Sequence, residues 1–449
     1  SKLNIKKINF NDIDINYSSQ DILMKLGELY QFESGIYGYG NIWTKLERNI
    51  EEIIIEELDK ADCIQVEFPK LQPRSIWDKS NRWNQYTEEN DIMFHIKNNF
   101  GEYGLAPTAE ECATIFGSNR LLSYKQLPTT YYQIGEKFRK EIRARGYLFR
   151  PRTFVMMDAY SFDKDEENMH KTFNKMHNVY MNIFKRIGIN IVPVISDGGT
   201  MGGRVSEEFQ AITKLGEDII LYDKNTNIGI NKEVLSFKDK ETFINKLNGI
   251  SLNKMEEVNS VELGNNFELG TKYSDLMEMY YQDENGNNKP FYMGCYGIGL
   301  GRIIATIIEN NVLIKDEKIK GFVIPYNVAP YKVHIVYSEQ NKDKAIELYE
   351  RLLENNIQCI IDDRDNLILG NKINDVALLG TPKLIVLGNK YDNINYEIED
   401  LKTGEKDIVK KENIILDPGM GFGKTAEANL EITRKLELLN SLGCEILYA

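Results

Sequence analysis

The segment 138–158, FRKEIRARGYLFRPRTFVMMD, decides the fold prediction for this chain. Its two ends are typical of strands, and its middle is rich in Arg and contains a Gly. We therefore expect strands over about 130–143 and 152–160, joined as an antiparallel hairpin with a long tip. Because side chains two residues apart on a strand share a face, Arg139 and Glu141 are expected to point the same way.

The side chains of this hairpin are suited to a nucleotide. An arginine such as Arg139 can bind a phosphate through two parallel charge-assisted hydrogen bonds. A carboxylate beside it, Glu141, can accept a hydrogen bond from the amino group of adenine. The ring of Phe154 can stack against a purine.

Two further segments carry the argument. Residues 41–60 have apolar residues at helical spacing, and VEFPKLQP (66–73) follows with an expected strand over 63–68 that stops at Pro69. GIGLGR (297–302) joins an expected strand over 290–297 to a helix over 299–310. Its glycines let a ligand approach closely beside Arg302, but no dinucleotide-binding unit follows.

Each segment alone is weak, since an Arg-x-Glu pair is usually a solvated ion pair and a GIGLGR stretch is usually a turn. In this order, however, they resemble the three motifs of class II aminoacyl-tRNA synthetases. The resemblance extends from about residue 22 to 410, where the chain is similar to bacterial prolyl-tRNA synthetases. It rests on GLAPTAEE (104–111), DAYSF (158–162), LGTKYS (269–274), MGCYGIG (293–299) and the stretch 361–388.

The resemblance implies a role for individual residues. Arg139 and Arg302 would be catalytic. The proline-binding residues would be Thr108, Glu110, Arg139, Ser206 and Phe209. The ATP-binding residues would be Arg139, Glu141, Arg150, Phe154 and Arg302.

It also implies ATP and Mg²⁺ as cofactors, tRNA(Pro) and proline as partners, and a homodimer formed through about 41–69. Carboxylates at the metal would come from the strand before the third motif, where Glu262 is a candidate. Catalysis would consist of positioning and charge stabilisation by arginines and Mg²⁺, so that no proton-transfer residue is needed.

The expected fold class is α+β. Residues 1–325 would form a catalytic domain, an antiparallel sheet flanked by helices, with a small insertion at about 223–260. Strands alternating with helices over 331–410 predict a small α/β domain of the anticodon-binding type with a largely parallel sheet. Its elements are expected at 333–338, 341–355, 359–363, 371–379 and 383–388. Residues 411–449 would be an extension of unclear role.

Composition agrees with a soluble globular protein of two or three domains. The 449 residues are 42% hydrophobic and 27% charged, with a net charge of −13 that argues against non-specific nucleic-acid binding. The five cysteines lack CxxC spacing and the four histidines lack ligand spacing. We therefore predict no zinc or other protein-held metal site, no disulfides, no membrane span and a cytoplasmic location.

The chain departs from the family pattern at several places, including Thr153 and Met157, which replace a Glu and a Lys in the second motif. Glu207 stands where the family usually has a His, and this position is expected to lie at the amino-acid pocket. The Glu-Arg-Pro element expected near the anticodon is absent from 365–370. The editing insertion is missing, which predicts that mischarged alanine is not cleared in cis.

The tail 417–443, DPGMGFGKTAEANLEITRKLELLNSLG, resembles a strand–loop–helix piece of dihydropteroate synthase. One such unit cannot form the barrel of that enzyme. We expect a fusion remnant or a helical extension rather than a second active site.

Three functions are open at this point. The first is prolyl-tRNA synthetase. The second is a paralogue that keeps the adenylation site but uses another amino acid or acceptor, which a reshaped pocket or the lack of a basic face on 333–410 would indicate. The third is an inactive binding protein with this fold, which loss of ATP binding would indicate.

Overall fold

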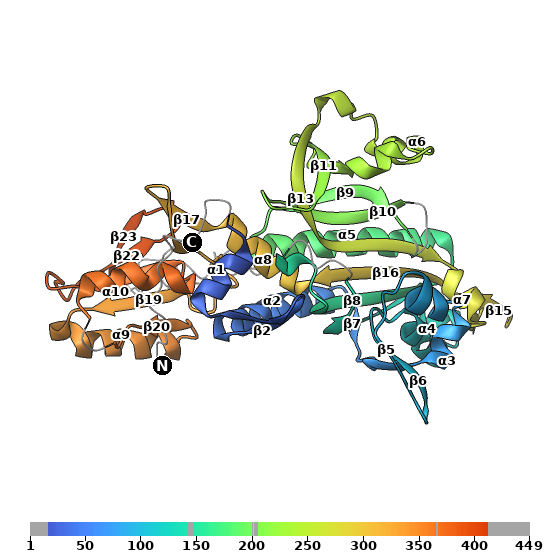
Figure 1. Ribbon diagram of the computed structural model, residues 1–449, viewed down its shortest axis with the longest axis horizontal. Coiled ribbons are helices and arrows are strands. Elements are labelled where there is room, and N and C mark those ends of the chain that lie inside the picture. Colours follow the sequence, from blue (N-terminus) through green and yellow to red (C-terminus); the bar gives the residue numbers. More distant parts are fainter. Residues whose placement is uncertain (1–16, 142–146, 200, 202–204, 365–366, 412–449) are drawn as a thin grey trace.

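The computed structural model describes residues 17–141, 147–199, 201, 205–364 and 367–411. The tail resemblance at 417–443 lies outside the described residues. Figure 1 shows two sheets arranged along the long axis, a large one with helices packed against it and a smaller one near the C-terminal end of the described chain.

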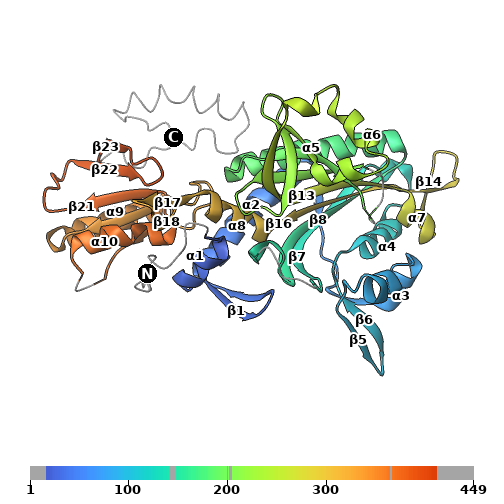
Figure 2. The same cartoon turned by 45° about the horizontal axis from the view of Figure 1, so that its top comes forward.

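The large sheet has nine strands in the order β10-β9-β12-β11-β13-β16-β8-β7-β3. All neighbouring pairs are antiparallel except β3–β7 and β9–β12. Strand β10 also pairs with β13, so β9 to β13 close into a five-stranded ring, visible in Figure 2. The strands are β3 (Ile64–Gln65), β7 (Thr129–Phe138), β8 (Thr153–Asp163), β9 (Val192–Asp197), β10 (Val205–Ile212), β11 (Asp218–Asp223), β12 (Ile228–Asn231), β13 (Glu256–Gly270) and β16 (Tyr292–Gly299).

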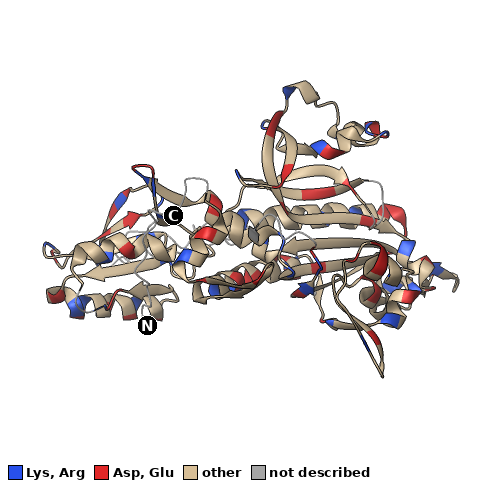
Figure 3. Ribbon diagram, viewed as in Figure 1, with Lys and Arg blue, Asp and Glu red and all other residues tan. Residues whose placement is uncertain are grey.

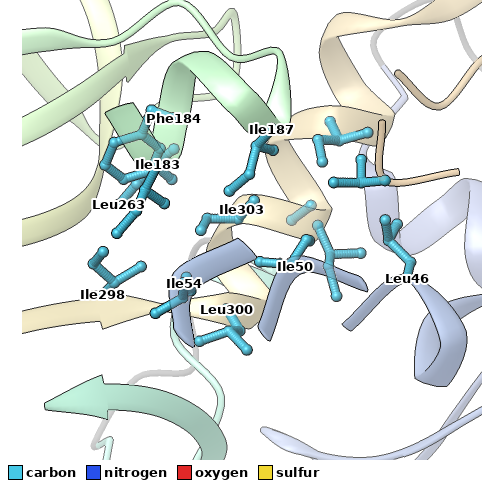
Figure 4. Close-up of a cluster of buried hydrophobic side chains, with 14 of the residues drawn as sticks. Leu46, Ile50, Ile54, Ile183, Phe184, Ile187, Leu263, Ile298, Leu300 and Ile303 are labelled. Atoms are coloured by element: carbon cyan, nitrogen blue, oxygen red, sulfur yellow. The ribbon is translucent and has the colours of Figure 1, made fainter. Parts of the chain in front are cut away.

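Helices α2 (Asn41–Lys60), α5 (Glu166–Ile187) and α8 (Leu300–Asn310) pack together against this sheet. Their apolar residues recur at helical spacing, so each helix buries one stripe in a shared core. Figure 4 shows Ile50 and Ile54 of α2 facing Ile183 of α5 and Ile303 of α8. This core covers one face of the sheet. Helix α1 (Ser19–Leu26) packs beside α8 at the edge of the core.

Smaller elements surround the other end of the sheet and its flanks. They are α3 (Arg74–Lys79), α4 (Glu110–Arg120), α6 (Glu241–Ile244), α7 (Lys272–Leu276), and the paired strands β1 (Leu29–Glu33) with β2 (Ile36–Tyr39), β4 (Leu71–Pro73) with β6 (Gly101–Leu105) and β5 (His95–Asn98), β14 (Tyr280–Gln282) with β15 (Asn288–Pro290), and β17 (Val312–Lys315) with β18 (Lys318–Phe322).

The C-terminal sheet has the order β20-β19-β21-β22-β23, with helices α9 (Lys342–Glu354) and α10 (Leu369–Asp375). Strands β19 (Val333–Tyr337), β20 (Cys359–Ile361) and β21 (Lys383–Leu387) are parallel, as predicted. Strands β22 (Asn395–Asp400) and β23 (Lys406–Lys410) were not predicted, and they extend the sheet antiparallel.

Several predicted bounds differ from the structure. The helix over 41–60 is confirmed as α2, because its periodicity is unbroken. The strand expected over 63–68 is only β3, and β7 ends at Phe138 rather than at 143. The segment 223–260, expected as a small insertion, is folded, and Ile230, Val234, Phe243 and Leu247 form a small core of their own there.

Candidate active site

A cavity of about 700 Å³ lies where the hairpin β7–β8, the loop before α4 and the ends of β13 and β16 converge. Its volume is that of a typical small-molecule site. Seven of the nine predicted site residues line it: Thr108, Glu110, Arg139, Glu141, Arg150, Phe154 and Arg302. The structure therefore brings together three sequence segments that are separated by up to about 190 residues.

Arg139 lies at the centre of this arrangement. Its Nε and Nη2 donate to the carbonyl of Pro107 at 3.2 and 3.1 Å, and its guanidinium lies 5.2 Å from the centre of the Phe154 ring. The arginine thus joins the Thr108 side of the cavity to the Phe154 side. Since β7 ends at Phe138, Arg139 and Glu141 do not share a strand face as predicted, and the Glu141 N–H donates to the Arg139 carbonyl in a tight turn.

Glu110 is the first residue of α4, and its side chain is fully buried. The Thr108 hydroxyl lies 2.8 and 2.7 Å from its two carboxylate oxygens, and the Cys295 thiol lies 3.3 Å from Oε1. Burial has the largest single effect and raises the pKa of Glu110, but the Arg82 guanidinium and the hydrogen bonds from Thr108 and the backbone together lower that pKa below its ordinary value. The end of the cavity beside Thr108 therefore holds an anionic group without direct access to bulk water.

Arg82 was missed from the sequence. It is almost fully buried and donates to Glu110 Oε2 at 3.1 Å and to Glu111 Oε1 at 3.0 Å. The sequence offered one indication of its burial. Arg82 lies in a stretch with Trp77, Trp83 and Tyr86, and such a density of aromatic residues indicates a packed interior.

Two further arginines, Arg150 and Arg302, line the cavity. Arg302 Nε donates to the carbonyl of Phe149 at 2.9 Å, and its Nη1 donates to the carbonyl of Glu262 at 2.8 Å. Arg150 is paired with Glu217. Hydrogen bonds to protein oxygen atoms therefore restrict the position of each arginine side chain.

A second cavity of about 240 Å³ opens at the mouth of the five-stranded ring, and Arg150, Glu262 and Arg302 line both cavities. Its other acidic side chains are Asp197, Glu208, Glu217, Asp218 and Glu233. Burial, and then the Glu262 carboxylate, raises the pKa of Glu208 to about 8 and that of Asp218 to about 6. Within the described residues, no three His, Cys, Asp or Glu side chains converge as a preformed metal site.

Ser206 and Phe209 do not line the main cavity. Phe209 packs in the core, 4.8 Å from the ring of Tyr180, and the Ser206 hydroxyl donates to the carbonyl of Asp197. Glu207 also does not line it. It faces α5, where its carboxylate lies 2.8 Å from Nδ1 of His177. The expectation that position 207 contributes to the amino-acid pocket is therefore wrong for this structure.

A chain of hydrogen bonds connects the first motif region, the hairpin β7–β8 and the loop before α4. The Phe68 N–H donates to Gln133, and Gln133 donates to Asp158. The Tyr160 hydroxyl also donates to Asp158 and accepts from the N–H of Ala109, directly before Glu110. The Pro69 end of the first motif is thus tied to the loop that carries Thr108.

Comparison with known proteins agrees with this geometry. The chain is 36% identical over 412 residues to a proline–tRNA ligase of Rickettsia akari (strain Hartford), covering 89% of this chain and 94% of that relative. The chain belongs to the proline–tRNA ligase family. A relative from Rickettsia bellii (strain OSU 85-389) is 37% identical over 403 residues, covering 86% and 91%.

Two family models match consecutive parts of the ligase chain. The tRNA synthetase class II core domain matches 91–311, and the anticodon binding domain matches 322–416. The model of pterin binding enzymes matches 387–449, which includes β22 and β23 as well as the tail outside the described residues.

Solved structures confirm the fold class. Prolyl-tRNA synthetase from Cryptosporidium parvum, complexed with halofuginone and AMPPNP, has a TM-score of 0.69 at 16% identity, covering 94% of this chain and 77% of that one. The same enzyme complexed with L-proline and AMP has a TM-score of 0.68 at 16% identity, covering 94% and 78%. Among the residues that the structure describes, no helix is long and apolar enough to cross a membrane.

Proposed function

We propose that this chain activates proline with ATP to form prolyl-adenylate and transfers the prolyl group to the 3′ end of tRNA(Pro). The observation that carries the proposal is the shared cavity. Glu110, a buried carboxylate beside Thr108, lines the same cavity as the arginines Arg139, Arg150 and Arg302, and Arg139 is bonded to the carbonyl of Pro107, next to Thr108. This distribution of charge matches an amino acid whose carboxylate meets the phosphates of ATP.

Glu110 and Thr108 would bind the imino group of proline. Glu110 is held by Thr108 and Cys295, so its carboxylate can receive a cationic imino group without reorganising. Arg139 would bind the proline carboxylate and the α-phosphate together, since its guanidinium is fixed by the Pro107 carbonyl. The reacting oxygen and phosphorus are thereby positioned for attack.

Phe154 and Glu141 would bind adenine, and Arg150 and Arg302 would bind the phosphates. The proline carboxylate oxygen forms a bond to the α-phosphorus, and the bond to the pyrophosphate oxygen breaks. The departing charge is stabilised by the arginines. No side chain has to transfer a proton in this step.

Mg²⁺ fits the site as a cation that enters with ATP. Magnesium in such sites is held by one or two carboxylates together with phosphate oxygens. Glu262, which contacts Arg302 and borders both cavities, would supply a carboxylate. When bound, the ion would neutralise phosphate charge.

We infer a homodimer formed through 41–69 and a cytoplasmic location. Strand β3 is an edge strand of the large sheet, and Ile64 on it is 50% exposed, which supports an interface there. The described cysteines Cys63, Cys112, Cys295 and Cys359 are all free thiols, which fits a reducing compartment.

The proposed division into domains, at about 325–331, is supported by separate hydrophobic cores. One cluster includes Ile335, Leu348 and Ile385 of the C-terminal sheet and α9, and a second lies between that sheet and α10. The core of the catalytic part is a third cluster, which also includes Leu378 of the C-terminal part.

One observation favours a second candidate function, a paralogue that charges another acceptor. Residues 333–411 contain eleven Lys and Arg against fifteen Asp and Glu. Several of the cations are paired, including Lys383 with Asp400 and Arg364 with Asp362. In Figure 3 the positions of basic and acidic residues are interspersed along the ribbon of this part.

Charging of purified tRNA(Pro) with labelled proline separates the two functions. Our proposal predicts prolyl-tRNA(Pro) at a rate comparable with adenylate formation. Adenylate formation without charging of tRNA(Pro) would instead support the paralogue.

A further inference from the structure

Arg82 lies in the interior directly below the Glu110 carboxylate. Its side chain is 4% exposed, and its Nη1 contacts both Glu110 at 3.1 Å and Glu111 at 3.0 Å. The guanidinium carbon lies 4.5 Å from the centre of the Tyr86 ring and 5.3 Å from that of Tyr273. Stacking between aromatic rings leaves a planar guanidinium little freedom to move.

Arg82 does not belong to the cavity wall, and neither does Glu111. Its guanidinium therefore touches no substrate in our account. It contacts the Glu110 carboxylate instead. Arg82 donates to Oε2 of Glu110, while the Cys295 thiol lies against the other oxygen, Oε1. Together with Thr108, these contacts fix the plane of the Glu110 carboxylate.

The neighbouring Glu111 makes this arrangement necessary. Glu110 and Glu111 are consecutive and both fully buried. Glu111 accepts a hydrogen bond from Ser80 at 2.6 Å, while its Oε2 has no partner in the described structure. Two buried carboxylates without a cation would repel each other, and one of them would take up a proton.

We propose that Arg82 is the positioning residue that holds the Glu110 carboxylate in the orientation that receives the imino group of proline. The proposal rests on the proposed function of Glu110 and extends it to a residue behind the cavity. Loss of Arg82 frees Glu110 to turn and lets it share a proton with Glu111. Binding of the amino acid then weakens, while the ATP end of the cavity is unaffected.

The test is ATP–pyrophosphate exchange by the full chain with Arg82→Gln, Arg82→Lys and Arg82→Gln/Glu111→Gln. We expect Arg82→Gln to raise the KM for proline about 10- to 100-fold, the range for losing a charge-assisted hydrogen bond, with an unchanged KM for ATP. Arg82→Lys should raise the KM for proline by a smaller factor than Arg82→Gln, because lysine keeps the positive charge but lacks the planar guanidinium. The double variant should recover part of the loss, because Glu110 then has no carboxylate to share a proton with.

Arg74→Gln is the matched control. Arg74 stacks on Trp83 and pairs with Glu102, but it does not touch Glu110. It should leave the KM for proline unchanged. If Arg82→Gln does not fold, Arg82→Lys decides the matter, and a KM for proline equal to that of the wild type would overturn the proposal.

Other outcomes are equally decisive. Equal increases in KM for proline and for ATP, or no recovery in the double variant, would show a general structural role and overturn the proposal. Failure of the wild type to use proline would instead contradict the proposed function. In that case a crystal structure of Arg82→Gln still decides, since a Glu110 carboxylate that remains on Thr108 refutes positioning and a displaced one supports it.

Discussion

Replacing Arg302 with glutamine should impair the ATP end of the site selectively. In the structure Nε and Nη1 of Arg302 donate to two backbone carbonyls, of Phe149 and Glu262, and Nη2 has no protein partner among the described residues. The free Nη2 group is therefore available for a phosphate. Charge-assisted hydrogen bonds contribute about 1.5–3 kcal/mol, which corresponds to a factor of about 10–150 in binding.

The assay is ATP–pyrophosphate exchange at varied ATP and varied proline. We expect the KM for ATP to rise about 10- to 100-fold, or the exchange rate to fall by a similar factor if the contact forms only in the transition state. The KM for proline should remain close to that of the wild type. Thermal unfolding should be recorded for each variant, because the lost carbonyl contacts also cost about 1 kcal/mol each.

Arg186→Gln provides the matched control. Arg186 is also partly buried and also bound to carboxylates, Glu56 and Glu57, but it does not line the cavity. It should reduce stability without changing either KM. An Arg302→Gln variant with wild-type KM for ATP and wild-type exchange rate would refute the reasoning.

Three further predictions concern other parts of the chain. Phe154→Ala should raise the KM for ATP about tenfold with little effect on proline, because stacking on a base contributes about 1–3 kcal/mol; equal effects on both substrates would contradict this. Lys137→Met should lower the free energy of unfolding by about 3–5 kcal/mol, because it leaves the buried Asp158 carboxylate without the Lys137 ammonium that lies 2.7 Å away. Urea titrations should show that adding Asp158→Asn restores part of this lost free energy. The Glu207 hydrogen bond raises the pKa of His177 above its ordinary value of 6.5, so its stabilisation is present below that value and is lost as the pH rises through the raised pKa. The melting temperature of His177→Gln should therefore fall further below that of the wild type at about pH 6 than at about pH 9. An equal decrease at both pH values would contradict a stabilising ion pair between His177 and Glu207.

The parts of the fold that local pattern determines were predicted well. Helix α2 has the predicted bounds because its apolar stripe continues over five turns without a breaker. The hairpin β7–β8 and the start of α8 after the third motif were predicted for the same reason, since strand alternation and glycine spacing are readable within a short window.

The ring formed by β9 to β13 could not be predicted, because its closing pair, β10 with β13, joins strands about 50 residues apart. Ser206 and Phe209 lie three residues apart on β10, so their side chains point to opposite faces of the strand, and neither lines the cavity.

The role of Arg82 was also hidden from the sequence. Its carboxylate partners lie almost 30 residues later, and only packing shows that the intervening aromatic residues exclude water. Similarly, the contact between His177 and Glu207 joins α5 to β10, and neither residue signals the other.

The most direct test of the account is ATP–pyrophosphate exchange without tRNA, measured with each of the twenty amino acids. The account predicts exchange with proline alone, because the Glu110 end of the cavity binds an imino group and position 207 does not contribute to it. Exchange driven by a different amino acid would contradict the assigned substrate, and no exchange with any of the twenty in folded protein would contradict the assigned reaction.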